Sequence, residues 1–507
     1  VLAQLGYKVC VLEAHEVAGG STHDYVVDGK TDWKFPSGLH YTIPASEPML
    51  QVACGAATPP VRFGRMGDDS VKGDSAYDRV RLMRANEPEL RIISDVDVKA
   101  ELHRRFPGLK VQLDRTIRLS SVLLASFPLW SALHVLPWSL RRPLLTLLLP
   151  SAWWRYASRS AEEVFAELFA DAPAEERENV IKLQAYLCGL WLDSGCAPHK
   201  VSFWMIAATG LGFPHEGGAY PEGGTGEMAA ALVQSLEARD GVCFVRAPVT
   251  KILVDEGGRA TGVEIAASLP KGSESMVQAE TVRLNARHAV VSACGWRNTL
   301  RLCSDVRLPK DSELELQQGV GFVMANIGVR GSAAELGLEC TNLELLPAGN
   351  GMSIFDGVRA YLADPLGVPH SEIPMMVTFP SVKDRARKGV SGAESVQLLA
   401  VAETAWFGEL DKPEVGTASA PTWKQPERSS SYAALKKRWL DRLVALLLLC
   451  YPQLEGKLEM VDLSTPMTIE HYLPSGSGSA IGLDTAAGPG CRFTDFNTMR
   501  LLDMKTA

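Results

Sequence analysis

Signatures of metal and nucleic-acid binding are missing from this sequence. None of its ten cysteines forms a CxxC pair, so zinc sites and thioredoxin-type redox motifs have no support and we expect no metal centre. Lysine and arginine number 51 against 59 aspartates and glutamates, which gives a net charge of −8. Because a nucleic-acid binder needs a basic footprint, this balance argues against nucleic acid as a main partner.

Common catalytic motifs are missing too. There is no GxSxG nucleophile elbow, and His15-Glu16 lacks the second histidine that an HExxH zinc protease requires. Gly29-Lys30-Thr31 resembles the end of a P-loop, but Asp24 stands where that loop begins with glycine. No GxGxxG turn occurs anywhere in the chain. These gaps leave serine hydrolases, zinc proteases and P-loop enzymes without support.

What is present is an ordinary globular composition. The hydrophobic fraction of 46% and the charged fraction of 22% exclude wholesale disorder, and 507 residues favour two to four domains. The sequence begins at Val1 without a methionine or a signal-peptide pattern, and it ends on the apolar rhythm Leu501-Leu502-Asp503-Met504. We therefore expect it to be a fragment of a longer protein.

The residue after the first strand, Glu13, carries the sharpest signal. Residues 8–12 form a short apolar run after a helix that Gly6 would end, which is the βαβ rhythm of a parallel sheet. In a dinucleotide-binding unit an acidic residue at this place binds the ribose, about 20 residues after a glycine turn. That turn would precede Val1. Glu13 alone also fits an ordinary surface residue, but Gly19-Gly20 shortly after it favours the dinucleotide interpretation.

Residues 225–295 have the clearest periodicity. Thr225 is the predicted N-cap of a helix whose apolar face is formed by Met228, Leu232 and Leu236. Strands are predicted at 242–245, 249–254, 262–266 and 282–284, followed by a buried strand at 289–292 that leads into the small-residue turn at Ala293-Cys294-Gly295. Residues 432–451 predict a further long helix.

Residues 119–154 form the most apolar segment. No charged residue occurs from Leu119 to Leu140, a length that could span a bilayer. Pro128 and Pro137 are predicted to break the helix, and the tryptophans near Arg141-Arg142 suit a membrane interface. Three interpretations stay open, namely a segment that lies on or dips into a membrane, a buried tunnel lining, and a true span.

Several stretches resemble a known superfamily. Residues 11–15, 19–21 and 37–41 are similar to the flavin amine-oxidase-like superfamily, which contains phytoene desaturases, carotenoid isomerases and retinol saturases. Residues 220–224 before a helix and residues 249–252 are typical of the same group. The retinol saturase branch is the one that the chain resembles nearly end to end, on residues 38–41, 335–338, 378–384, 403–407 and 465–468.

The resemblance implies an α/β (α+β overall) fold with a Rossmann-like FAD-binding domain and an inserted substrate domain. The FAD-binding domain would comprise residues 1–45, 210–305 and 465–507, and the substrate domain residues 46–209 and 306–464, with 119–154 facing a membrane. The family's N-terminal glycine turn and its C-terminal flavin segment, expected after Lys505, are absent. Both absences fall at chain ends, which again favours a truncated chain.

The same resemblance implies roles for individual residues. Glu13 would bind the adenosine ribose of FAD, and the backbone of Val249 would meet the adenine edge. The remaining implied cofactor contacts are Gly19, Gly20, Ser21, Gly38, His40, Ala293 and Gly295. His40, together with Gly38, would lie near the isoalloxazine. The others are small because only small side chains let the backbone touch a dinucleotide.

The implied activity is saturation of one carbon–carbon double bond of a retinoid or related polyene by a flavin. His40 and Tyr41 are the candidate proton donors, and NAD(P)H is a candidate electron donor. The expected partners are an apolar polyene and a peripheral membrane surface, of a plastid or of the endoplasmic reticulum. Two alternatives stay open: a carotenoid isomerase or phytoene-type desaturase, and an apolar-lipid binding protein without catalysis.

Overall fold

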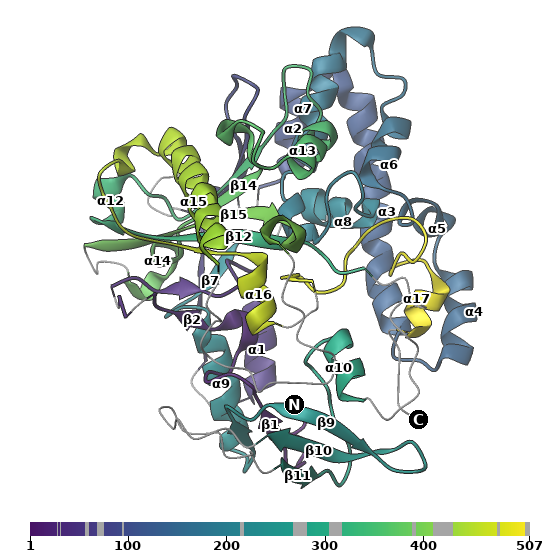
Figure 1. Cartoon of the computed structure of the whole chain (residues 1–507). Coiled ribbons are helices and arrows are strands. Elements are labelled where there is room, and N and C mark those ends of the chain that lie inside the picture. The colour runs from purple at the N-terminus through teal and green to yellow at the C-terminus, as the bar shows by residue number, and fades with distance from the viewer. Residues whose placement is uncertain are drawn as a thin grey trace.

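A computed structural model describes residues 1–501 except 28, 31, 56–59, 68–75, 94–95, 213–216, 267–280, 304–316, 388–391, 409–428 and 474–476. Three parts are visible in Figure 1: a central sheet, a helical lobe beside it, and a smaller lobe that carries β1 and β9. This mixed α/β architecture confirms the predicted fold class.

The central sheet has seven strands in the order β16-β12-β15-β14-β13-β5-β6. Their bounds are Ala76–Leu82 (β5), Leu90–Ile93 (β6), Gly321–Arg330 (β12), Asn342–Leu346 (β13), Met375–Thr378 (β14), Ala393–Ala402 (β15) and Leu458–Ser464 (β16). Neighbours pair antiparallel, except that β13 runs parallel to β5. The inner strands are buried along nearly their whole length because both faces of the sheet are covered.

One face of this sheet is covered by α15 (Ser430–Cys450), as the periodicity of residues 432–451 predicts. Trp439, Leu443 and Leu447 are buried in the same core as Val323 and Ile327 of β12. Shorter helices lie around the sheet: α12 (Ala333–Leu336), α13 (Ile354–Ala363), α14 (Pro380–Lys383) and α16 (Pro466–Tyr472).

The helical lobe contains α2 (Val98–Arg105), α3 (Lys110–Leu133), α4 (Trp138–Leu148), α5 (Ser151–Tyr156), α6 (Ala161–Leu168), α7 (Arg177–Leu187), α8 (Phe203–Ala207) and α17 (Phe496–Leu501). The expectation that Pro128 breaks the first helix is wrong, because Pro128 lies inside α3. Pro137 does separate α3 from α4. Tryptophan and phenylalanine rings of this lobe pack together, Trp153 and Trp204 among them.

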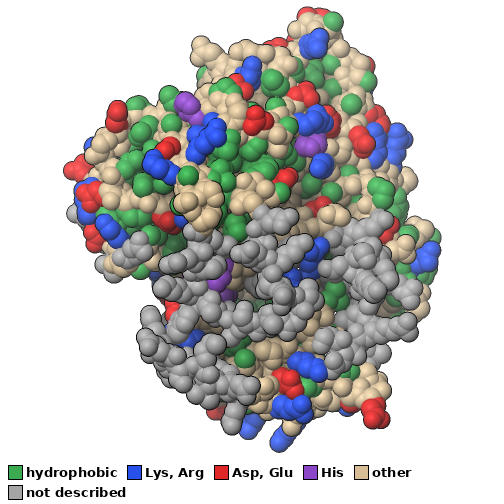
Figure 2. Space-filling view, in the orientation of Figure 1, with side chains coloured by type: hydrophobic (Ala, Val, Ile, Leu, Met, Phe, Trp, Pro, Cys, Tyr) green, Lys and Arg blue, Asp and Glu red, His purple; other side chains and the backbone are tan. Residues whose placement is uncertain are grey.

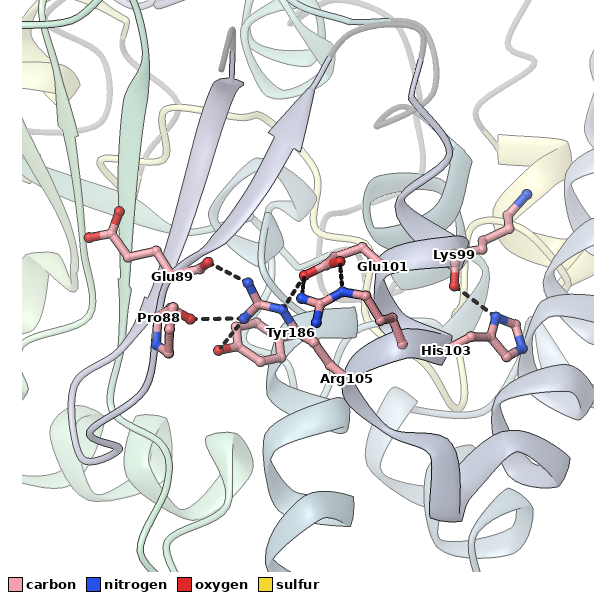
Figure 3. A network of polar contacts seen from close by, with 8 residues as sticks. Pro88, Glu89, Lys99, Glu101, His103, Arg105 and Tyr186 are labelled. Carbon is pink, nitrogen blue, oxygen red and sulfur yellow. Dashed lines mark hydrogen bonds and ion pairs between the residues drawn. The ribbon is translucent and has the colours of Figure 1, made fainter. Parts of the chain in front are cut away.

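Arg105 ties the helical lobe to the edge of the sheet. Its guanidinium donates to the backbone oxygens of Pro88 (2.8 Å) and Glu89 (2.6 Å) and to the carboxylate of Glu101 (2.6 Å), and it lies beside the Tyr186 hydroxyl (Figure 3). These charge-assisted bonds fix α2 against the loop that precedes β6.

The smaller lobe contains the parallel pair β1 (Cys10–Leu12) and β8 (Val242–Phe244) and an antiparallel sheet of β9 (Val249–Val254), β10 (Ala260–Ala266) and β11 (Thr281–Asn285). Its helices are α1 (Ser46–Cys54), α9 (Gly226–Glu237) and α10 (Trp296–Leu302). Two short strand pairs complete the set of described strands, β2 (Asp24–Tyr25) with β3 (Phe35–Pro36) and β4 (Phe63–Arg65) with β7 (Ala219–Pro221).

Three details of this lobe differ from expectation. Residues 2–6 form turns rather than a helix, and residues 289–292 lie outside any strand and are mostly exposed rather than buried. The helix α9 begins as predicted, but the Thr225 hydroxyl donates to Asp24 (2.7 Å), and Asp24 rather than Thr225 accepts the backbone N–H of Gly226. The buried face of α9 consists of Ala229, Ala231 and Ser235, since short side chains let it pack closely, and Leu232 is exposed.

Residues 33–41, which are continuous in sequence with the smaller lobe, cross the second face of the central sheet. We call them the crossing segment. Trp33 packs flat over Gly328 of β12, where an added Cβ would lie 2.5 Å from the indole ring. The Trp33 indole N–H donates to the backbone oxygen of Val329 (3.3 Å), and the side-chain amide of Gln397 on β15 donates to the oxygen of Pro36 (3.1 Å). This crossing segment fixes the position of His40 and Tyr41 over the sheet.

The contact between Trp33 and Gly328 gives a prediction for stability. Gly328→Ala is expected to lower the free energy of unfolding by about 1–3 kcal/mol, because the new methyl group overlaps the indole ring. In a Trp33→Ala background the same substitution should cost much less. Urea unfolding of the two single variants and the double variant measures both costs, and equal costs would contradict the contact.

Candidate functional site

Glu13 lies directly after β1, at the end of the parallel pair. Its backbone N–H donates to Phe244 (2.8 Å), and its backbone oxygen accepts from the N–H of Ala247 (2.8 Å), so the turn after β1 is bound to the connection from β8 to β9. One carboxylate oxygen accepts the N–H of His15 (2.8 Å). The side chain is half-buried, and it therefore keeps a surface available to a ligand.

The turn at Gly19, Gly20 and Ser21 lies against Gly38. Both glycines of the pair have positive φ, +131° and +53°, which only glycine adopts without strain. The oxygen of Ser21 accepts the N–H of Leu39 (3.0 Å), and a Cβ on Gly38 would come within 2.9 Å of the Ser21 side chain. Ser21 and Gly38 are exposed, so two backbone segments meet at an accessible surface.

Three further predicted residues lie on the β9 side of this lobe. Val249 begins β9 and pairs with Ile265, next to the turn that holds Glu13. Ala293 and Gly295 precede α10, which packs against β9 and is seen beside it in Figure 1. Gly295 has φ +90° and open space where a Cβ would point. The predicted residues are thus placed around β1 and β9.

A row of polar side chains crosses the middle of the central sheet on the face that the crossing segment covers. Asp78, Asn342, Thr378, Gln397 and Asn326 stand on five neighbouring strands, and we call them the polar row. All five are fully buried. The Asn342 amide donates to Asp78 (2.7 Å) and accepts from Thr378 (2.7 Å), and the Gln397 amide donates to Asn326 (2.8 Å).

Lys383, the last residue of α14, joins the polar row to the crossing segment. It is 1% exposed, and its ammonium donates to the backbone oxygen of His40, to Thr378 (2.5 Å) and to Asn342 (3.3 Å). Burial lowers the pKa of Lys383 to about 7. A lysine in this state exchanges a proton near neutral pH.

His40 lies over the polar row with its Nδ1 atom buried. Burial, and then the charge of Lys383, lower the pKa of His40 to about 3. The imidazole is therefore neutral at physiological pH. This makes His40 a poor acid, which weakens its candidacy as a proton donor and leaves Tyr41.

Tyr41 faces a group of three carboxyl groups. Its hydroxyl donates to Asp193 (3.0 Å), which lies in the 3₁₀ turn Trp191–Ser194, and it also interacts with Asp78. Glu344 of β13 is 2% exposed and lies near both acids. Burial raises the pKa of Asp78 to about 7 and that of Asp193 to about 6, and it raises the pKa of Glu344 well above its usual range. We call Asp78, Asp193 and Glu344 the acid trio.

The acid trio and Lys383 were not identified from the sequence. Two signals existed: Thr378 and Lys383 stand in residues 378–384, a stretch quoted for the resemblance, and Glu344 is a charged residue between two leucines of β13. Asp193 carries no local signal, because its partner Tyr41 is 152 residues away in sequence.

No protein-family model matches the chain. It is similar to an all-trans-retinol 13,14-reductase of Danio rerio, at 26% identity, and to one of Homo sapiens, at 27%, each over 96% of this chain and 75% of the relative. A second Danio rerio relative, 24% identical over 92% of this chain and 72% of its own, is named an inactive all-trans-retinol 13,14-reductase.

Among solved structures, an oxidoreductase from Methanosarcina mazei superposes with a TM-score of 0.50 and 14% identity, covering 92% of this chain and 84% of that one. That likeness concerns the fold. The relatives confirm the resemblance of the sequence to the retinol saturase branch.

The raised pKa of Asp78 predicts a pH dependence of stability. An acid whose pKa rises on folding stabilises the native state most below its unfolded pKa, and this contribution is lost as the pH rises through the folded value. Asp78 faces Tyr41, Asp193, Glu344 and Lys383. Glu344 changes the stability in the same direction. Lys383 has a lowered pKa of about 7 and has the opposite effect, because it makes the stability rise with pH above about 7.

We therefore expect the melting temperature of the wild type to fall between about pH 4 and pH 7 more steeply than that of Asp78→Asn, whose amide cannot ionise. Melting curves across this range measure both slopes. The exposed substitution Asp441→Asn should leave the wild-type slope unchanged, and equal slopes for Asp78→Asn and the wild type would contradict the assignment.

Proposed function

We propose that this protein is an FAD-dependent oxidoreductase that saturates one carbon–carbon double bond of a retinoid or related polyene. The observation that carries the proposal is a juxtaposition: an accessible glycine turn at 19–21 and Gly38 lies next to a buried set of proton-holding groups around Tyr41. Likeness over 96% of the chain to proteins named all-trans-retinol 13,14-reductase supports the substrate class.

The described residues fit a bound flavin dinucleotide. Gly20 and Gly295 have open space where a Cβ would point, so the backbone can approach a ligand there. Glu13 ends β1 of a parallel pair, the place from which a carboxylate binds ribose hydroxyls. The cofactor residues of this proposal are Glu13, Gly19, Gly20, Ser21, Gly38, Val249, Ala293 and Gly295.

When bound and reduced, a flavin supplies the hydride for such a reaction. The chain's own residues position the reactants and supply the proton. Lys383 holds the backbone of His40 in place, and Gly38 leaves the surface beside it free of a side chain. The Tyr41 hydroxyl gives the proton, because the neutral imidazole of His40 is a poor proton donor.

The helical lobe supports a peripheral membrane site at which an apolar substrate is taken up. The stretch Pro107–Leu133 is long and apolar enough to cross a bilayer, and 28% of its most apolar window is buried, but a single such helix also fits a soluble core. Exposed apolar side chains continue along α3 and α4: Val122, Leu129, Val135, Leu140, Leu147 and Leu148. A plastid membrane and the endoplasmic reticulum are both compatible with this proposal.

In this proposal the FAD-binding domain comprises residues 1–45, 210–305 and 465–507. The surface in Figure 2 shows basic and acidic side chains interspersed on the face in view.

One alternative of another class is favoured by the relative named inactive: binding of an apolar ligand without catalysis. A carotenoid isomerase or desaturase is the alternative within the enzymes.

The test of this function uses the full gene product, reconstituted with FAD and reduced without oxygen. Incubation with all-trans-retinol should yield a product heavier by two hydrogens, whereas an isomerase leaves the mass unchanged and a desaturase lowers it. NAD(P)H replaces the chemical reductant in a parallel arm. Flavin bands without any product would favour the non-catalytic alternative, and absence of flavin binding would overturn the proposal.

In the same preparation Glu13→Ala should weaken FAD binding by roughly ten-fold or more, because two hydrogen bonds from ribose hydroxyls to a carboxylate are lost. Titration of the apoprotein with FAD, followed by its visible spectrum, measures the affinity. Glu16→Ala is the control, since Glu16 is exposed and pairs with Arg246. An unchanged affinity in Glu13→Ala would show that the ribose assignment is wrong.

A membrane surface on the helical lobe predicts the behaviour of two side chains. Leu147 and Val135 are 78% and 77% exposed, and inserting each into a bilayer contributes about 1.5–3 kcal/mol. Leu147→Ser and Val135→Ser should each weaken binding to phosphatidylcholine vesicles roughly ten-fold or more. Co-sedimentation measures this, with Val52→Ser on α1, equally exposed, as the control. Equal loss in all three variants would argue against this surface.

A further inference from the structure

Two buried carboxyl groups, one exposed carboxyl group and one tyrosine hydroxyl meet where the crossing segment ends. Tyr41 donates to Asp193, and Asp78 and Glu344 stand on adjacent parallel strands on the same side of the sheet, at register positions two residues apart. Asp78 is 0% and Glu344 2% exposed. Carboxyl groups at such positions need a role or a compensating partner.

The partners present do not compensate three negative charges. Oδ2 of Asp78 and Oε2 of Glu344 are buried without a hydrogen bond of good geometry from any residue in the described part of the chain. Asp78 accepts from the Asn342 amide (2.7 Å) and interacts with the Tyr41 hydroxyl, and Lys383 donates its protons to His40, Thr378 and Asn342. A buried carboxyl group without donors is held in its protonated form, because ionisation there is costly.

Asp193 differs from the other two acids in being accessible. Its side chain is exposed, although the protein around it raises the pKa of the carboxyl group to about 6 by desolvation. It therefore connects the buried pair and Tyr41 to solvent. The order from inside to outside is Glu344 and Asp78, then the Tyr41 hydroxyl, then Asp193.

We propose that Asp78, Asp193 and Glu344 form a proton store that returns a proton to Tyr41 after each turnover. This inference rests on the proposed function. In saturation of a double bond, a hydride brings both electrons to one carbon, and the second carbon needs a proton. The O–H bond of Tyr41 breaks and a C–H bond forms.

The phenolate then takes the proton of Asp193, and the acid trio regains one proton from solvent. Charge balances over the cycle, since each turnover consumes one hydride and one proton. In this scheme Tyr41 alone touches the substrate, and the acid trio acts through it. Lys383 is a positioning residue, because it holds the backbone oxygen of His40 next to Tyr41.

The first test measures protonation directly and needs neither flavin nor activity. Infrared spectra of the full gene product should contain the C=O stretch of protonated carboxyl groups at pH 6, which shifts in D₂O and fades as the pH rises above about 7. Asp78→Asn and Glu344→Gln should each remove part of this band, and both changes preserve the shape of the side chain.

Glu394→Gln is the matched control. Glu394 is also buried, but its two oxygens accept from the Ser381 hydroxyl (2.5 Å) and from the N–H of Ala333 (3.1 Å), whereas Asp78 and Glu344 each have one oxygen without a donor. Its replacement should leave the band unchanged. A wild type without the band at pH 6, or a band that survives in the variant with both Asp78→Asn and Glu344→Gln, would overturn the proposal.

The second test uses the holoenzyme and retinol. Tyr41→Phe should lower kcat by roughly a hundred-fold or more with the flavin spectrum retained, because a general acid typically contributes this much. Glu344→Gln should lower kcat by roughly ten-fold, leave KM within two-fold, and change the alkaline limb of the pH profile. A normal pH profile in Glu344→Gln would contradict the store.

The two tests separate two kinds of failure. If the wild type does not reduce retinol, the proposed function fails, and the infrared result still decides whether the acid trio holds protons. If the wild type reduces retinol but lacks the band, only the proton store fails.

Discussion

The position of the candidate site depends on one interaction: the buried Gln397 amide and the buried Lys383 ammonium both donate to the backbone of residues 33–41. Gln397 donates to Pro36, and Lys383 donates to His40, so the crossing segment replaces the water that these groups would otherwise need. A polar row inside a sheet is costly unless each member is bonded. The segment cannot slide by one residue without leaving these donors unpaired, and this fixes His40 and Tyr41.

The same burial that fixes the segment determines the charge of the site. Lys383 interacts with Asp78, which lies near Asp193 and Glu344, and Coulomb repulsion between carboxylates grows as the surroundings lose water. Neutrality requires two protons on the acid trio if Lys383 is charged, and three if it is neutral. Near neutral pH, protons are therefore bound at this place by the fold itself. A reaction that consumes protons benefits from such a site, whereas a mere structural core would be more stable with apolar residues here.

The sequence predicts the local features of this molecule and misses those that depend on long-range packing. Glu13, the Gly19-Gly20 turn and Gly38 are found from spacing and small-residue patterns, because a strand end and a tight turn are encoded within a few residues. The face of α9 is predicted wrongly, since apolar periodicity marks Leu232 while the structure buries Ala229 and Ser235 against α1 and the turn at residue 19. Asp78 and Glu344 look like ordinary strand residues until β13 is paired with β5 across more than 260 positions.

The helical lobe and the acid trio are mechanically connected through Asp193. Trp191 and Leu192 precede it and are buried in the same aromatic core as Trp153 and Trp204, so the lobe that carries the exposed apolar side chains also positions this carboxyl group. An apolar substrate needs a dry path, but a proton needs a hydrated one. These requirements conflict in a single channel. In this fold Asp193 lies where the two kinds of surrounding meet: the residues before it are buried in the aromatic core of the lobe, and its carboxyl group accepts from Tyr41, which interacts with Asp78 of the polar row. A proton can therefore reach Tyr41 through the carboxyl group of Asp193 without crossing the apolar core of the lobe.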